Sequence, residues 1–276
     1  DTAFSKMDIT KITEENVKIF IRTTVGRLNL CKSACKTLFG YTNNVFKSAM
    51  INHYISENPM QYLSPKFFYQ YCTEKKKSKD KILVLDKDMV LLCEQLQEDY
   101  KNQPEYIPSY AVELAILTGM RVGEIAALTW DSISKDGILI NKSEKYNRKT
   151  NTYFIDATKN KKERLFPMCN EISNLLDKVK KAELQNGYIC EWVFANEDGR
   201  VHAPVISSCI KNKCRQLGIE ERGIHALRKT FNSKIRNIGV APTVAATLLG
   251  HSVEVNQKYY TFDVTSNDEK KEIVSL

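Results

Sequence analysis

The feature that most constrains the fold of this chain is a charged and polar run, TEKKKSKDK, at residues 73–81. The run contains no apolar residue, so it has no periodicity that could pack against a core. We interpret it as a linker between a short segment, residues 1–72, and a longer segment, residues 82–260, with a tail at residues 261–276. A length of 276 residues also favours two domains over one.

Net charge is distributed unevenly between the two segments. Residues 1–80 hold 13 Lys and Arg against 7 Asp and Glu, whereas residues 81–276 hold 28 against 26. A small basic segment joined to a near-neutral one indicates a module that binds polyanions, although a basic surface can also serve solubility alone. The sequence has no run of about 18 apolar residues, so no transmembrane helix is expected.

The eight cysteines are scattered along the chain, mostly in apolar surroundings, and no two of them form a C-x-x-C pair. No His-x-x-x-His cluster is present to complete a zinc site. We therefore interpret the cysteines as reduced, buried thiols of a cytosolic protein, and we expect no metal.

The first segment has the pattern of a small all-helical unit. One helix is expected to begin at Thr13, because Glu14 and Glu15 suit a first turn. A second is expected through residues 31–55 and is broken at Pro59. The apolar residues of this second helix recur at roughly helical spacing: Leu38, Val45, Phe46, Ala49 and Met50.

The second segment mixes helical and β-type patterns. Helices are expected over residues 86–100, 108–119, 171–184, 205–217, 225–237 and 242–249. Three short strands are expected at residues 136–141, 150–159 and 163–168, with Asn160–Lys162 as the turn of the last hairpin. The chain is thus predicted to be mainly α with a small antiparallel β-sheet, as a helical domain followed by an α+β domain.

Two stretches place basic side chains beside a break in regular structure. In TGMRVGEIAAL, Arg121 follows a helix end at Gly119 and has Glu124 within reach three residues later. In ATKNKKERLFPM, Lys159 lies at a strand end beside the turn. A surface ion pair and a solvated hairpin tip are the alternative interpretations of these two stretches.

Two further stretches contain histidines. HALRKTF spaces His225 and Arg228 three residues apart, on one face of a helix. LLGHSVEVNQKYYTFD has His251 just past a helix end at Gly250, with Tyr260 nine residues later. The alternatives are a capping histidine with a surface arginine, and a surface histidine with two half-buried aromatics.

Together the four stretches supply two guanidiniums, two imidazoles, one ammonium and one phenol. Guanidinium forks match phosphate oxygens and stabilise the charge of a phosphoryl transition state. An ammonium can protonate a departing alkoxide, and a phenol gains strength as a nucleophile beside positive charge. The set therefore suits phosphoryl transfer in which cationic side chains do the work of a metal.

In this order, the residues resemble the signature of the tyrosine recombinase (phage integrase) family, including the integrases of conjugative transposons and integrative elements. The signature is an Arg in TG-x-R-x-x-E, a hairpin Lys, H-x-x-R, an LGH histidine and a Tyr nine residues after it. The matching residues are Arg121 with Glu124 in support, Lys159, His225, Arg228, His251, and Tyr260 followed by Thr261.

The resemblance also chooses between neighbouring candidates. KKERLFPM is similar to the family's KERLVPL strand, which selects Lys159 over Lys161 and Lys162. The nine-residue spacing selects Tyr260 over Tyr259, and we interpret Tyr259 as a packing residue.

The resemblance implies a site-specific DNA recombinase that moves a mobile element. Tyr260 would attack a DNA phosphate, giving a 3′-phosphotyrosyl link and a free 5′-hydroxyl, and Lys159 would protonate the leaving oxygen. The phosphate would be held by Arg121, Arg228, His225 and His251, without metal, ATP or another cofactor. A type IB-like topoisomerase and a non-catalytic DNA-binding regulator on the same scaffold are the alternative functions.

The resemblance covers residues 82–265 and, more faintly, residues 8–72 as a core-DNA-binding domain. It implies double-stranded DNA as partner, a homo-oligomer of up to four protomers, an accessory excision or bending factor, and a tail that docks on a neighbouring protomer. Lys32, Lys36 and Lys47 are candidate DNA contacts. We expect a bacterial, nucleoid-associated cytoplasmic protein, and an N-terminal portion that is missing here, because the match begins inside the helical domain.

Overall fold

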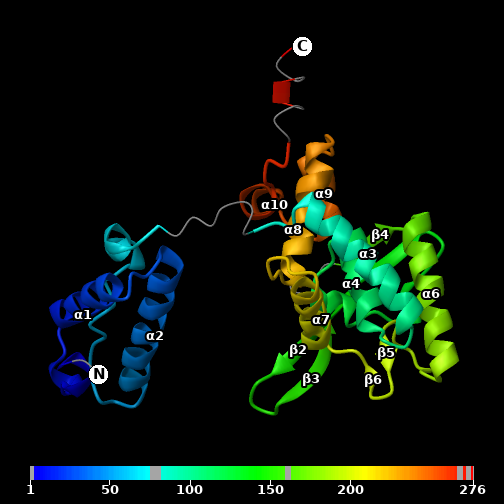
Figure 1. Ribbon diagram of the computed structural model, residues 1–276. Helices are drawn as coiled ribbons and strands as arrows, with labels where there is room; N and C mark the ends of the chain where they lie inside the picture. Colours follow the sequence, from blue (N-terminus) through cyan, green and yellow to red (C-terminus); the bar gives the residue numbers. More distant parts are fainter. Residues whose placement is uncertain (1–2, 75–81, 159–162, 266–269, 272–274, 276) are drawn as a thin grey trace. The chain divides into compact units, whose positions relative to one another are not determined.

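The computed structural model describes all residues except 1–2, 75–81, 159–162, 266–269, 272–274 and 276. The chain divides into two compact units, residues 1–77 and residues 78–276 (Figure 1). Each unit has its own hydrophobic core, so each is described by itself.

The first unit is helical in the part that the structure describes. The 3-10 helices η1 (Ala3–Lys6) and η2 (Ile9–Lys11) precede α1 (Glu14–Arg27) and α2 (Lys32–Ile51), and η3 (Pro65–Tyr71) contacts both α1 and α2. Helix α1 begins where the acidic first turn predicts. The Thr13 hydroxyl accepts from the Asn16 backbone and the Asn16 side chain accepts from the Thr13 backbone, which is a capping box.

Only part of the apolar pattern of α2 lies on its buried face. Val45 is 58% exposed and Met50 is 38% exposed, whereas Phe46 and Ala49 are buried. The buried residues recur every three or four positions: Cys35, Phe39, Thr42, Phe46 and Ala49. Adjacent helix residues point about 100° apart, so the stripe that buries Phe46 and Ala49 turns Val45 and Met50 outward.

The second unit is mostly helical with short antiparallel sheets, which confirms the predicted fold class. Six of its helices lie within a few residues of the predicted ranges: α3 (Asp86–Asn102), α4 (Pro108–Thr118), α6 (Asn170–Asn186), α7 (Ala203–Gln216), α8 (Ile224–Asn237) and α9 (Pro242–Leu249). The sequence analysis did not identify the short helix α5 (Val122–Ile125), the turn η5 (Trp130–Ser132) or α10 (Val253–Tyr260).

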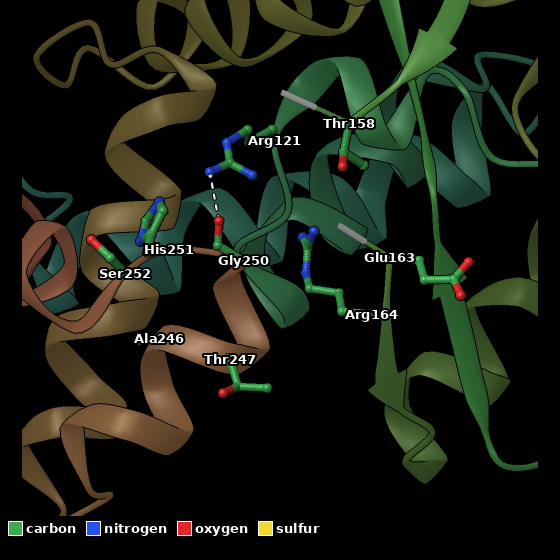
Figure 2. A pocket seen from close by; sticks show the side chains of 9 residues that line it. All are labelled: Arg121, Thr158, Glu163, Arg164, Ala246, Thr247, Gly250, His251 and Ser252. Atoms are coloured by element: carbon green, nitrogen blue, oxygen red, sulfur yellow. Dashed lines mark hydrogen bonds between the residues drawn. The ribbon is translucent and has the colours of Figure 1, made fainter. Parts of the chain in front are cut away.

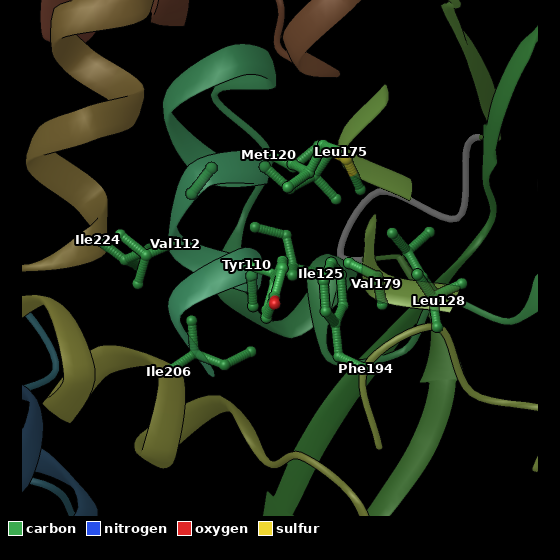
Figure 3. Packing of buried hydrophobic residues seen from close by; sticks show 14 of the residues in the cluster. Tyr110, Val112, Met120, Ile125, Leu128, Leu175, Val179, Phe194, Ile206 and Ile224 are labelled. Carbon is green, nitrogen blue, oxygen red and sulfur yellow. The ribbon is translucent and has the colours of Figure 1, made fainter. Parts of the chain in front are cut away.

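Helix α4 is the centre of the core of this unit. Eight of its eleven residues are buried, and the helix contacts α3, α5, α6, α7 and α8. Figure 3 shows side chains of α6 (Leu175, Val179), α7 (Ile206) and α8 (Ile224) gathered in the same cluster. A helix that is apolar on nearly all sides is expected to be surrounded in this way. The end of α4 is therefore held rigidly where the candidate site begins.

The predicted strand pairing is wrong. Strand β1 (Gly137–Ile140) pairs antiparallel with β4 (Arg164–Pro167), and β2 (Lys142–Asn147) pairs with β3 (Thr152–Ala157). Among the described residues, β3 and β4 do not form the expected hairpin, and its turn at Asn160–Lys162 lies outside the described residues. Strand β2 has the sequence KSEKYN, which lacks an apolar alternation, so its pattern did not reveal it.

Three other features of the structure can be compared with what the sequence indicates. All eight cysteines are free; Cys35, Cys209 and Cys214 are buried, but Cys169 and Cys190 are exposed, so burial was predicted correctly only in part. A small β5 (Ala195–Asn196) and β6 (Gly199–Arg200) hairpin follows α6 and was not predicted. None of the helices in the described part of the chain combines the length and apolar character that crossing a bilayer requires.

A buried ion pair ties α3 to α7. The Lys213 ammonium lies 2.6 Å from the Asp99 carboxylate, and each side chain is 7% exposed. Removing one partner of a buried pair leaves an uncompensated charge, which typically costs about 3–5 kcal/mol. We expect Lys213→Ala to lower the free energy of unfolding of the second unit by about this amount. Urea denaturation followed by tryptophan fluorescence measures it, because both tryptophans, Trp130 and Trp192, lie in this unit.

Lys101→Ala is the matched control for this variant. Lys101 lies on the same helix as Asp99 and pairs with Glu98 at 2.7 Å, but the two side chains are 69% and 55% exposed. Exposed pairs contribute about 0–1 kcal/mol. A loss from Lys213→Ala no larger than that from Lys101→Ala would show that the buried pair does not hold α3 against α7.

Candidate active site

The turn between α4 and α5 presents Arg121. Helix α4 ends at Gly119, whose φ of +61° is left-handed, and a Cβ there would lie 2.8 Å from Phe231. Glycine therefore suits both the backbone and the space at this turn. Arg121 is the N-cap residue of α5, and its Nη1 donates to Glu124 Oε1 at 2.8 Å. The expected contact between Arg121 and Glu124 is present. The Glu124 carboxylate is buried, so the alternative of a surface ion pair is wrong.

The carboxylate of Glu124 binds two arginines of the site, Arg121 and Arg164. It is 1% exposed and accepts hydrogen bonds from the backbone and Nη1 of Arg121 and from Nη1 and Nη2 of Arg164. Burial raises the pKa of Glu124, but the hydrogen bonds and charges of Arg164 and Arg121 outweigh it and lower the pKa to about 2. Glu124 is therefore ionised at neutral pH and holds both guanidiniums in place.

Arg164, which the sequence analysis did not single out, completes this cluster. It begins β4, its side chain is 7% exposed, and its Nε donates to the Leu248 carbonyl at 2.8 Å. Alternate residues of a strand point to the same face, and Phe166 is buried whereas Leu165 is 53% exposed. This alternation, together with a glutamate inside the apolar stretch VGEIAAL, is the signal that could have identified Arg164.

Helix α8 supplies Arg228, which is 1% exposed. Its Nη1 donates to the Gly119 carbonyl at 2.7 Å, and its Nη2 donates to the Leu249 carbonyl and contacts His251 Nε2 at 2.7 Å. Burial and then the charge of Arg121 lower the pKa of Arg228 to about 9, so it remains charged at neutral pH. The alternative of a surface arginine is therefore wrong.

The two histidines lie beside these guanidiniums. A guanidinium can only donate, so its contact with Arg228 makes His251 Nε2 an acceptor and places the proton on Nδ1. Burial and the charges of Arg228 and Arg121 lower the pKa of His251 to about 3. His225 keeps an exposed surface, and partial burial together with Lys229 and Arg228 lowers its pKa as well. Both imidazoles are neutral at neutral pH.

Tyr260 is the last residue of α10, and its ring joins this cluster. The ring centroid lies 4.0 Å from that of His251 and 5.3 Å from that of His225, and the Arg228 guanidinium carbon lies 5.5 Å from it. Tyr259 points about 100° away on the same helix and is 53% exposed. The interpretation of Tyr259 as a packing residue was therefore wrong, and Tyr260 is the tyrosine that faces the cluster.

Three of these side chains, Arg121, Arg164 and His251, line a pocket of about 480 Å³ (Figure 2). Arg121 and Arg164 reach into it from the turn after α4 and from β4, and His251 lies on the side of α9 and α10. Its other lining residues are Thr158, Glu163, Ala246, Thr247, Gly250 and Ser252. Arg228 Nε and His251 Nδ1 are buried and have no hydrogen-bond partner among the described residues.

The remaining predicted residues lie elsewhere. Lys159 lies outside the described residues. Lys32, Lys36 and Lys47 lie on α2 of the first unit, and all three are exposed. In the ranges that the structure describes, no three His, Cys, Asp or Glu side chains are grouped to hold a metal ion. The candidate site contains arginines, histidines, a phenol and the carboxylate of Glu124, and a second carboxylate, that of Glu163, lines the pocket.

The low pKa of His251 predicts loss of stability in acid. The folded pKa is about 3 and the ordinary value is 6.5, so between these values the unfolded chain binds the proton and the folded chain does not. The stability from neutral His251 is present above pH 6.5 and is lost as pH falls toward 3; Glu124 adds a second loss below pH 4.5. We expect the free energy of unfolding to fall from about pH 7 to about pH 4, and His251→Gln to flatten this dependence.

Urea denaturation at several pH values, again followed by tryptophan fluorescence, measures this slope. His53→Asn is the control, because His53 lies in the first unit and its φ of +58° is one that asparagine tolerates. An unchanged slope in His251→Gln would contradict the assignment of a neutral, depressed histidine at this position.

Comparison with known proteins supports one family. The model of the phage integrase family matches residues 84–265. A tyrosine recombinase XerC-like protein of Caldanaerobacter subterraneus subsp. tengcongensis is 30% identical over 174 residues, which are 54% of this chain and 44% of that protein. The match therefore spans less than half the length of this relative.

Two solved structures have the same fold. The Tn1549 transposon integrase in complex with a circular intermediate DNA gives a TM-score of 0.71 at 16% identity, covering 99% of this chain and 90% of that one. A lambda integrase tetramer bound to a Holliday junction gives 0.59 at 15% identity, covering 94% of this chain and 67% of that one. Since the family model spans about two thirds of the sequence and includes every residue of the site, this chain belongs to the phage integrase family.

Proposed function

We propose that this chain is a site-specific DNA recombinase that cleaves and rejoins strands through a 3′-phosphotyrosyl intermediate on Tyr260. The observation that carries the proposal is the packing of the Tyr260 ring against His251, His225 and Arg228. A phenol beside guanidiniums gains nucleophilic strength, and the same cations attract the phosphodiester that it attacks. The phenol and its anionic target are thereby brought to one place.

The charges of the site support an anionic substrate. Arg121, Arg164 and Arg228 carry three positive charges against the two carboxylates of Glu124 and Glu163, while the histidines are neutral. Arg228 Nε and the protonated His251 Nδ1 are buried donors without an acceptor among the described residues, a costly state that a phosphate oxygen would relieve. The site therefore favours a group with several anionic oxygens.

The proposed reaction exchanges one phosphoester for another. The Tyr260 hydroxyl gives its proton to solvent as its oxygen bonds to phosphorus, the bond from phosphorus to the 5′-oxygen breaks, and the 5′-oxygen takes a proton. Arg121 and Arg228 stabilise the charge on the phosphoryl oxygens, and we assign the proton to Lys159 by its resemblance to the family's hairpin lysine. A 5′-hydroxyl of a second strand then reverses the step, which completes strand exchange.

The partners of the relatives suggest those of this chain. The Tn1549 integrase was solved with circular intermediate DNA and the lambda integrase as a tetramer on a Holliday junction. We infer that this chain binds double-stranded DNA at the ends of a mobile element, as an assembly of up to four protomers, with an accessory factor and a tail that docks on a neighbour. The site of action would be the bacterial nucleoid.

Replacing each tyrosine tests the proposal. Tyr260→Phe removes only the nucleophilic oxygen and keeps the ring that packs on the histidines, so the variant should fold and bind DNA but form no covalent adduct. Tyr259→Phe, the matched control, should form the adduct. A nicked suicide substrate and a denaturing gel make the protein–DNA band visible.

The outcomes separate the candidate functions. An adduct from Tyr260→Phe would overturn the assignment of the nucleophile. No adduct from the unaltered protein would favour a DNA-binding regulator. Adduct formation without strand exchange between two duplexes would favour the type IB-like topoisomerase.

The first unit is proposed to contact the DNA backbone through α2. At about 100° per residue, Lys32, Lys36 and Lys47 fall within about 60° of one another around the helix, beside its buried stripe. If each contacts one phosphate, replacing all three with Ala should reduce the slope of log K against log salt by about 2–3, at about 0.9 per contact. Binding measured at several salt concentrations gives the slope.

Three other lysines provide a control of equal charge. Lys6, Lys11 and Lys66 are exposed in the same unit but do not lie on α2. Replacing these three with Ala should change the salt slope much less. Equal changes in the two triple variants would reject a specific contact through α2.

A further inference from the structure

A closed ring of hydrogen bonds joins α8 to the end of α10. Asn256 Nδ2 donates to Asn232 Oδ1 at 2.7 Å, and Asn232 Nδ2 donates to Thr261 Oγ1 at 3.2 Å. The Thr261 hydroxyl donates in turn to Asn256, with its backbone oxygen at 3.2 Å and Oδ1 at 3.3 Å. Both asparagines are 0% exposed. Two amides and a hydroxyl thus satisfy one another away from water.

The same residues hold the backbone of Tyr260. Asn232 Nδ2 donates to the Tyr260 carbonyl at 2.9 Å, and Ser233 Oγ donates to it at 3.2 Å. Ser233 Oγ also accepts from the Phe262 backbone at 3.0 Å. Helix α10 ends at Tyr260, so this carbonyl has no partner within its own helix. Helix α8 therefore caps the helix that carries the tyrosine.

The spacing along α8 connects this contact to the phosphate site. His225, Arg228 and Asn232 occupy positions i, i+3 and i+7, which share one helix face. One rigid helix thus carries two proposed phosphate-binding side chains and the groups that hold the Tyr260 backbone. The separation between tyrosine and phosphate is then set by α8.

We propose that Asn232, Ser233, Asn256 and Thr261, which we call the tyrosine latch, are positioning residues for cleavage. The proposal rests on the function proposed above for Tyr260. The latch residues act through the Tyr260 backbone. The ring fixes the orientation of each amide, because a flipped amide would face donor to donor. A displacement of about 1 Å at a reacting group can cost about 100-fold in rate, so the latch should affect cleavage strongly.

Thr261 offers the sharpest test, because it is only partly buried and valine keeps its shape while removing the hydroxyl. Thr261→Val removes the hydroxyl and breaks two sides of the ring, whereas Thr261→Ser keeps the hydroxyl and is the matched control. With enzyme in excess over a suicide substrate, we expect Thr261→Val to slow adduct formation about 10- to 100-fold and Thr261→Ser to stay near the unaltered rate. DNA affinity should be the same for all three proteins.

A second substrate separates positioning from damage to the phosphate site. DNA with a 3′-p-nitrophenyl phosphate can be joined to a 5′-hydroxyl strand without the tyrosine. The 5′-oxygen bonds to phosphorus, nitrophenolate leaves with the electron pair, and the hydroxyl proton passes to solvent. We expect Tyr260→Phe and the double variant Tyr260→Phe/Thr261→Val to ligate this substrate at equal rates.

These measurements distinguish the positioning role of the latch from damage to the phosphate site and from the role of Tyr260. Unaltered adduct formation by Thr261→Val would overturn the latch and leave the role of Tyr260 intact. Slower ligation by the double variant would show general damage to the site and would also overturn the positioning role. An adduct from Tyr260→Phe would overturn the assignment of Tyr260 as the nucleophile, and with it the latch that acts on Tyr260.

Discussion

The site depends on the pairing of one buried, ionised carboxylate, that of Glu124, with the guanidiniums of Arg121 and Arg164. Taking a charge out of water is costly unless opposite charges and hydrogen bonds compensate it. Here Arg121 and Arg164 supply both, from the turn after α4 and from β4. The carboxylate therefore orients two guanidiniums that would otherwise be long, mobile side chains, and it joins a helix turn to a strand edge.

The C-terminal end of α9 is the second support of the arginines. Helix ends leave carbonyls unpaired, and cations are favoured there. Three consecutive carbonyls at this end each accept from a different arginine: Leu248 from Arg164, Leu249 from Arg228 and Gly250 from Arg121. The left-handed turn at Gly250, with a φ of +63°, also leaves room for Arg164, since a Cβ there would lie 2.9 Å from its Nη1. The LLGH stretch thus organises guanidiniums as well as supplying a histidine.

Six helices of the second unit and five residues of the candidate site were predicted from the sequence, because both depend on local patterns. Periodicity locates α4 and α6, and short motifs locate Arg121, Arg228 and His251. The pairing of strands could not be predicted in this way. Strand β4 pairs with β1, which lies more than twenty residues earlier, and no local sequence pattern indicates this pairing. The alternation of β4 indicates that Arg164 faces inward, but its pairing with Glu124 joins residues 40 positions apart in the sequence.

Neutral histidines among three arginines have a consequence for the proposed reaction. Burial and the nearby guanidiniums lower the pKa of His251, so a bound phosphodiester, by cancelling part of that positive charge, would raise it again. In the free site neither imidazole takes up a second proton, whose positive charge would repel Arg228. In the proposed reaction the arginines would carry the charge that receives the substrate, and the histidines would act as directional hydrogen-bonding groups around it. Arg228 would thus serve both the anion and the phenol, because its guanidinium would bind the phosphate and its carbon lies 5.5 Å from the centre of the Tyr260 ring.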